Sequence, residues 1–236
     1  MDTTKIIAII ACAIVLLLIM VMSSKNRIFK TYKKYMKVDN KINKTGKEFA
    51  FMSKEILELH DLQFALVEDK LADAYSPKYK TLIMSEEVCN TASLSSIAIV
   101  SHELGHAMQH RDDSGLFFMN QMLVKFTNFT NKFILPLLIL GLFSFLFKYP
   151  NDSIGTVLML ISAGLFGLHV LKLIVTIPLE YDASRRALKY LKESNFITSS
   201  ELYRAKKLLG VAAQTYIANL LDSLFIFTKK KKRKKK

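Results

Sequence analysis

The sequence predicts a mainly α-helical membrane protein with a small β element and about three transmembrane helices. Hydrophobic residues make up 51% of the 236 residues, yet the formal net charge is +14. These two properties separate along the chain, because three long uncharged runs alternate with basic segments. Such alternation is typical of membrane spans with charged flanks. Helix is the default interpretation elsewhere, since the chain has no Trp and only eight Gly and four Pro.

The first uncharged run, Ile6 to Met22, predicts an N-terminal transmembrane anchor over residues 1–24. Its seventeen consecutive apolar residues are near the short limit for a span. The alternative is a cleaved signal peptide. The sequence disfavours it, because Lys5 is offset by Asp2 and no small-x-small cleavage site follows. Six basic residues between 25 and 37 place this flank in the cytoplasm by the positive-inside rule.

Residues 25–130 are expected to form a cytoplasmic part. A helix should begin at the cap Thr45. Two extended pieces, 64–68 and 81–85, flank a turn around Tyr75–Pro77 and predict a hairpin or small sheet edge beside the next helix. That helix is predicted from Ser93 to about Gln109.

The predicted helix contains the pattern H-E-x-x-H, formed by His102, Glu103 and His106. Residues at i and i+4 project from one helix face, so the two histidines can hold one metal ion. Glu103 lies about 100° around the helix axis, beside the ion without binding it. The pattern therefore predicts a zinc site, with one Zn²⁺ per chain.

Residues 131–178 predict a transmembrane hairpin. The runs 133–147 and 154–171 are uncharged and are separated by a short polar turn at 149–153, which this topology places outside. Basic residues after the second run return the chain to the cytoplasm. Residues 179–228 are expected to form cytoplasmic or interfacial helices, although a further span within 208–227 is the alternative. The basic tail Lys229–Lys236 is expected to lie on an anionic lipid surface.

A catalytic zinc ion usually has a third protein ligand, and Glu180 is the best candidate. Pro178 should end the last span and start a helix with Glu180 in its first turn, and the hairpin would return it to the histidines. Asp182 is the rival ligand, or it would hold a ligand histidine by its second ring nitrogen. His110 lies a turn too far along the helix, and His169 lies within an uncharged run. In the structural alternative, Glu180 pairs only with a nearby arginine.

The residues suggest a reaction as well as a site. Zinc lowers the pKa of a bound water, and Glu103 would take its proton as general base. The tetrahedral oxyanion needs a further donor, and the sequence offers several without choosing among them: Tyr181, Arg185, Arg186 and Tyr216.

Two stretches, 101–110 (SHELGHAMQH) and 180–188 (EYDASRRAL), resemble the YugP-type neutral zinc metallopeptidases of bacterial membranes. The resemblance covers roughly residues 45–225 and implies a gluzincin-like zinc-binding helical core. It also implies that His102, His106 and Glu180 bind zinc and that Glu103 is the catalytic base. The chain departs from the family at 73–77, where members often have an acidic residue followed by His-Tyr-Asp-Pro.

The resulting prediction is a membrane-anchored zinc endopeptidase, integral to the bacterial cell membrane, with its site facing the cytoplasm. It would cut membrane or membrane-proximal proteins and peptides. Two alternatives are a site-2-type intramembrane metalloprotease and a catalytically silent membrane adaptor. The former is disfavoured because the run Leu94–Val100 is too short to span. The sequence disfavours nucleic acid as a partner, because no aromatic residues interleave with the lysines of the tail.

Overall fold

The structure is a computed structural model that describes residues 26–148 and 152–224, with side chains as far as residue 213. The predicted anchor over 1–24 and the basic tail at 229–236 lie outside the described residues.

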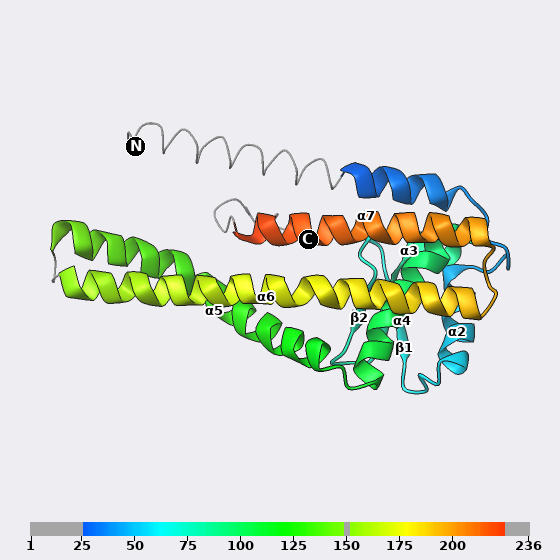
Figure 1. Cartoon of the computed structure of the whole chain (residues 1–236), viewed down its shortest axis with the longest axis horizontal. Coiled ribbons are helices and arrows are strands. Elements are labelled where there is room, and N and C mark those ends of the chain that lie inside the picture. Colours follow the sequence, from blue (N-terminus) through cyan, green and yellow to red (C-terminus); the bar gives the residue numbers. More distant parts are fainter. Residues whose placement is uncertain (1–25, 149–151, 225–236) are drawn as a thin grey trace. The chain divides into compact units, whose positions relative to one another are not determined.

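The described chain is mainly helical, with one small three-stranded sheet (Figure 1). The chain divides into two compact units, each made of two segments. The first unit contains the chain up to Phe117 together with Ile177–Ala218. The second unit contains Phe118–Thr176 together with the chain from Asn219. A helix at 26–36 precedes the labelled elements, which in order are α2 Gly46–Ile56, β1 Gln63–Val67, β2 Ala74–Ser76, β3 Thr81–Ser85, α3 Glu86–Asn90, α4 Leu94–Arg111, α5 Gly115–Phe147, α6 Asp152–Glu193 and α7 Ser199–Leu224.

Helix α2 begins where the cap residue predicts. The Thr45 side chain accepts from the Glu48 backbone N–H, and the Glu48 carboxylate accepts from the Thr45 N–H at 2.9 Å. This capping box satisfies backbone groups that the first turn would otherwise leave without partners. Phe49 and Ala50 then point into the core, where both are fully buried.

The predicted small sheet is present, but the hairpin alternative is wrong, because β1 and β3 lie parallel and not antiparallel. The strand order is β1-β3-β2, with β2 antiparallel to β3 along its other edge. The segment expected to be a turn, around Tyr75, is itself a short strand. Two adjacent parallel strands require a crossover connection from the end of the first strand to the start of the second. Residues 68–80 form this connection between β1 and β3, and they include strand β2.

Helix α4 is the centre of the first unit. Leu94, Ile97 and Leu104 are fully buried, and helices α2 and α3 and strands β2 and β3 pack against it. The second half of α6 also packs closely on α4. A Cβ added at Gly105 would lie less than 3.0 Å from the Ala183 carbonyl oxygen, so the two backbones meet at this point.

The second unit consists of the apolar parts of α5 and α6, which run side by side (Figure 1). The helices meet closely at Gly141 and Gly155, and the Ser162 hydroxyl donates to the Ile134 carbonyl at 2.8 Å. Among the described residues, α5 and Ser153–Glu193 of α6 are long and apolar enough to cross a membrane. These two helices overlap residues 131–178, for which a transmembrane hairpin is predicted, and they extend beyond both ends of that range.

The predicted helix boundary at Pro178 is also wrong, because α6 continues through this residue to Glu193. Proline removes one backbone hydrogen bond and costs a helix interior about 3 kcal/mol. Residues on both sides of Pro178 are buried, including Val175, Leu179 and Ala183. Their packing stabilises the helix where the hydrogen bond is missing. Glu180 therefore lies within a long helix and not in a first turn.

Candidate metal site

Three potential ligands converge in the first unit. His102 and His106 come from α4 and Glu180 comes from α6, and one ligand atom of each lies within 4.8 Å of the others. The Glu180 Oε2 atom is 3.2 Å from His102 Nε2 and 3.5 Å from His106 Nε2. No side chain of the three is more than 13% exposed. Two imidazole nitrogens and a carboxylate oxygen facing one point form the donor set of His₂Glu catalytic zinc sites.

The local sequence explains this convergence. The i, i+4 spacing on α4 brings the His102 and His106 rings to 4.9 Å between centroids. Gly105, on the side of α4 that meets α6, lets the backbone at Ala183 approach, and Glu180 is one turn from Ala183. Gly105, which lies between the two histidines, thus allows the close approach of α6, the helix that carries Glu180.

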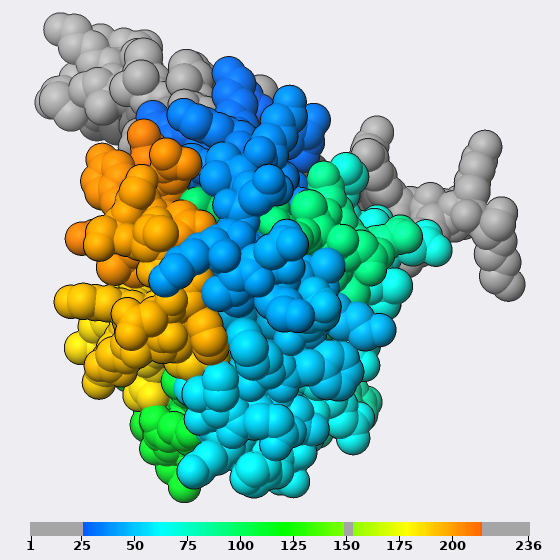
Figure 2. Space-filling model, turned by 90° about the vertical axis from the view of Figure 1, so that its right-hand side faces the viewer, coloured from blue at the N-terminus to red at the C-terminus, as the bar shows by residue number. Residues whose placement is uncertain are grey.

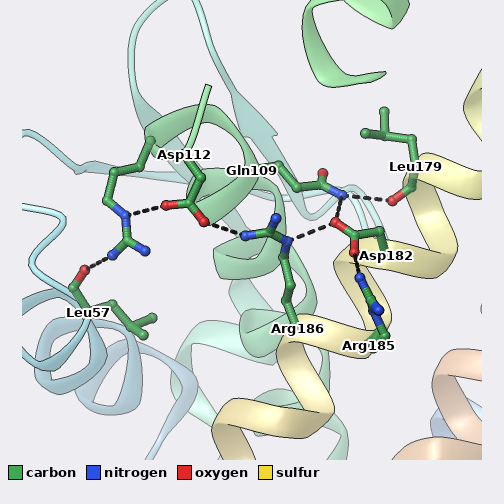
Figure 3. Close-up of polar contacts among 8 residues, drawn as sticks. Leu57, Gln109, Asp112, Leu179, Asp182, Arg185 and Arg186 are labelled. Atoms are coloured by element: carbon green, nitrogen blue, oxygen red, sulfur yellow. Dashed lines mark hydrogen bonds and ion pairs between the residues drawn. The ribbon is translucent and has the colours of Figure 1, made fainter. Parts of the chain in front are cut away.

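Both histidines are fixed at their second ring nitrogen. Ser184 Oγ lies 3.1 Å from His102 Nδ1, and Gln109 Oε1 lies 3.0 Å from His106 Nδ1. The Gln109 side-chain N–H₂ donates to the Leu179 carbonyl and to the Asp182 carboxylate, both at 2.9 Å (Figure 3). Because these two partners only accept, the Gln109 oxygen must face His106. His106 Nδ1 then carries a proton, so Nε2 is the nitrogen left to bind a metal at the ligand point.

Asp182 belongs to a charged network and not to the ligand cluster of the described residues. Its carboxylate accepts from Arg185 and Arg186, and Arg186 continues to Asp112 at the end of α4 (Figure 3). Arg111 pairs with the same Asp112 and donates to the Leu57 carbonyl. Partial burial alone would raise the pKa of Asp182, but the hydrogen bonds from Gln109 and the two arginines lower it to about 2. The structural alternative, in which Glu180 pairs only with an arginine, is therefore wrong, since Arg185 and Arg186 both pair with Asp182.

Glu103 lies beside the ligand cluster and is 5% exposed. Its Oε2 accepts the backbone N–H of Tyr75, on strand β2, at 2.9 Å. Burial raises the pKa of Glu103, while the nearby His102 and His106 oppose this shift. The Tyr75 phenol bonds to His110 Nδ1 at 2.8 Å, and burial raises the pKa of Tyr75 to about 12. Tyr75 was missed by sequence reasoning, because only the sheet topology brings it to α4.

The charges of the candidate ligands favour the binding of a cation. Burial would raise the pKa of Glu180, but hydrogen bonds from His102 and His106 lower it to about 2. Burial would lower the pKa of His106, and Glu180 instead raises it to about 9. The carboxylate therefore stays ionised and attracts positive charge, which a divalent ion supplies when it displaces the histidine proton.

The other candidate residues whose side chains the structure describes do not join the cluster. His110 bonds to Tyr75 and stacks on Phe117, and His169 lies in the second unit. Of the proposed oxyanion donors, Arg185 and Arg186 are engaged with Asp182, and Tyr181 is 52% exposed. The Tyr216 side chain lies outside the described part.

Comparison with known proteins extends these observations. Residues 8–230 match the family described as "Putative neutral zinc metallopeptidase". The chain is 34% identical over 199 residues to the "Putative membrane protease YugP" of Bacillus subtilis (strain 168), and the match covers 84% of each chain. No solved structure matches the chain.

Proposed function

This chain belongs to the neutral zinc metallopeptidase family and is a hydrolase, and from that premise we propose that it is a membrane-anchored endopeptidase with a gluzincin-like site. It would hydrolyse peptide bonds of membrane or membrane-proximal proteins at the cytoplasmic face. The observation that carries the proposal is the meeting of His102, His106 and Glu180 from two distant helices.

These three residues would hold one zinc ion per chain. The protein's contribution is a rigid ligand set, because Ser184 and Gln109 fix the two rings and Gly105 lets α6 approach. When bound, zinc polarises the scissile carbonyl and lowers the pKa of water.

Glu103 is the proposed general base. Its carboxylate is buried next to the ligands and is oriented by the Tyr75 N–H. Burial raises the pKa of Glu103 above that of a free carboxyl group, which makes its carboxylate a stronger base. Glu103 would take the proton of the attacking water and transfer it to the leaving amine.

The membrane assignment rests on two observations. Two described helices are long and apolar enough to span, and the Bacillus subtilis relative is named a membrane protease. The basic residues at 25–37 and after the second span favour a cytoplasmic site. The proposed anchor over 1–24 and an anionic lipid surface for Lys229–Lys236 complete this topology.

The two alternative functions receive less support. In a site-2-type protease the H-E-x-x-H helix lies within the membrane, whereas α4 is buried among α2, α3 and the sheet. A silent adaptor has no need of a buried base beside three converging ligands, each with its own outer partner.

The test is a comparison of Glu103→Gln with the exposed control Glu55→Gln. We expect purified Glu103→Gln to keep its zinc and to cleave an unfolded protein substrate on the order of 10²–10⁴-fold more slowly. Glu55→Gln should match the wild type in both measurements. Equal cleavage by wild type and Glu103→Gln would refute the mechanism.

A further inference from the structure

A groove of about 710 Å³ lies between the second half of α6 and α7, within the first unit. In Figure 2, the yellow end of α6 and the orange α7 form neighbouring parts of this surface. Apolar side chains line part of the groove: Leu188 from α6, and Leu202, Leu209 and Ala213 from α7. Gly210 leaves further room, since a Cβ added there would meet no atom within 4 Å.

The groove lies next to the candidate metal site, on the side where the second ring nitrogen of His102 is held. Ser184 lines the groove, and its hydroxyl lies 3.1 Å from Nδ1 of the proposed ligand His102. Tyr181 also lines it and directly follows the proposed ligand Glu180. A polypeptide lying in the groove would therefore pass beside Ser184 and the outer contact of His102.

The charged residues around the groove are mostly basic. Arg185, Lys189, Lys192 and Lys206 line it, against the single acidic residue Glu193. Arg185 is neutralised by Asp182, and Lys189 lies 3.9 Å from Glu193. Lys192 and Lys206 are exposed and form no ion pair within the described part of the chain. The groove thus offers two uncompensated positive charges beside apolar side chains.

We propose that this groove binds the substrate polypeptide and selects segments in which apolar residues are flanked by acidic ones. The inference rests on the proposed function, because a groove beside a peptidase site is occupied by substrate. Apolar side chains match the apolar lining, and carboxylates match Lys192 and Lys206. The Lys229–Lys236 tail is a poor occupant, because its charge has the same sign as that of the groove.

The first experiment uses full-length protein in detergent and two synthetic peptides. They share one apolar core, flanked by glutamates in one peptide and by glutamines in the other. We expect wild type to cleave the glutamate peptide with a kcat/KM about tenfold higher at low salt, and this ratio should fall at 0.5 M salt. The double variant Lys192→Glu/Lys206→Glu should lose the preference, whereas the control Lys47→Glu, an exposed lysine of α2, should keep it.

The outcomes separate two kinds of failure. If wild type cleaves neither peptide, the proposed function fails. If wild type cleaves both and the double variant keeps the same ratio, the groove proposal is overturned. The proposal is likewise overturned if the double variant keeps the peptide preference and loses only its binding to phosphatidylglycerol vesicles, because the groove would then be a lipid site.

A second variant tests the groove by filling part of its volume. Gly210→Leu should fill the open space without displacing neighbours, while leucine favours the helix more than glycine does. We expect KM for the glutamate peptide to rise several-fold with zinc content unchanged. Gly164→Leu, at an equally open position of α6 in the second unit, is the matched control. Equal KM values for the two variants would contradict the groove as the substrate site.

Discussion

The two helices that meet at the candidate metal site contribute to it in different ways. Helix α4 supplies two proposed ligands and the proposed base within five residues, from His102 to His106. The second half of α6 supplies one proposed ligand, Glu180, and the Ser184 hydroxyl that contacts His102. His106 is held by Gln109 of α4, whose amide donates to Asp182 of α6. Helix α4 thus carries most of the proposed chemistry, and both helices orient the histidines.

This difference separates two kinds of residue. A proposed ligand removed from either helix should weaken zinc binding most, whereas loss of an orienting contact should weaken it less. The predictions below test this distinction, beginning with the largest expected effect.

Loss of the α6 ligand should be the most severe change. We expect Glu180→Ala to lower zinc affinity by more than the roughly 10–100-fold that follows loss of an outer contact. Competition with a chromophoric chelator measures this affinity. Glu193→Ala, on the exposed end of the same helix, is the control. Undiminished affinity in Glu180→Ala would remove α6 from the ligand set.

Loss of the bridge between the helices should have a smaller effect. Gln109→Ala removes the acceptor that fixes His106 Nδ1, and zinc affinity should fall about 10–100-fold. Gln63→Ala removes the same side chain at an exposed position of β1 and should leave affinity unchanged. If both variants bind zinc equally, Gln109 does not orient the site.

The close approach of the two helices can be tested directly. Gly105→Ala places a methyl group against the Ala183 carbonyl and should lower the free energy of unfolding by roughly 1–3 kcal/mol. Gly164→Ala should not destabilise the protein, because its added methyl group meets nothing. Chemical denaturation compares the two, and equal stability would mean that α4 and α6 tolerate a wider separation.

The smallest effect is expected at Asp182 and should depend on pH. The folded-state pKa is about 2 and the unfolded value is about 3.9, so the ionised carboxylate stabilises the fold above pH 4. This contribution is lost as the pH falls toward 2. Asp182→Asn should therefore cost about 1 kcal/mol at pH 6 and progressively less below pH 4. A pH-independent difference in urea denaturation would show that ionisation of Asp182 is not the cause.

The sequence predicted the α4 half of the site better than the α6 half. The i, i+4 spacing of His102 and His106 is a local rule, and so is the cap at Thr45 that begins α2. Glu180 was predicted from the need for a third ligand, and the structure places its carboxylate beside both histidines. Gln109 is three residues after His106, so helix spacing could have indicated their contact. Ser184 meets His102 only because α6 packs on α4.

The remaining features depend on contacts distant in sequence. Whether β1 and β3 pair in parallel depends on the path of residues 68–80, which no local pattern specifies. The role of Tyr75 follows from that path, because β2 must reach α4 before its N–H can meet Glu103. The continuation of α6 through Pro178 depends on burial of its neighbours, which outweighs the intrinsic preference of proline.

The central claim is that α4 and α6 together form one His₂Glu zinc site. X-ray absorption at the zinc K-edge, on wild type and Glu180→Ala loaded with one zinc equivalent, tests it most directly. The predicted wild-type spectrum contains two imidazole nitrogens at about 2.0–2.1 Å and additional oxygen, with no sulfur. In Glu180→Ala the oxygen shell should change while both imidazoles remain. A sulfur shell, a third imidazole or identical spectra for the two proteins would contradict the claim.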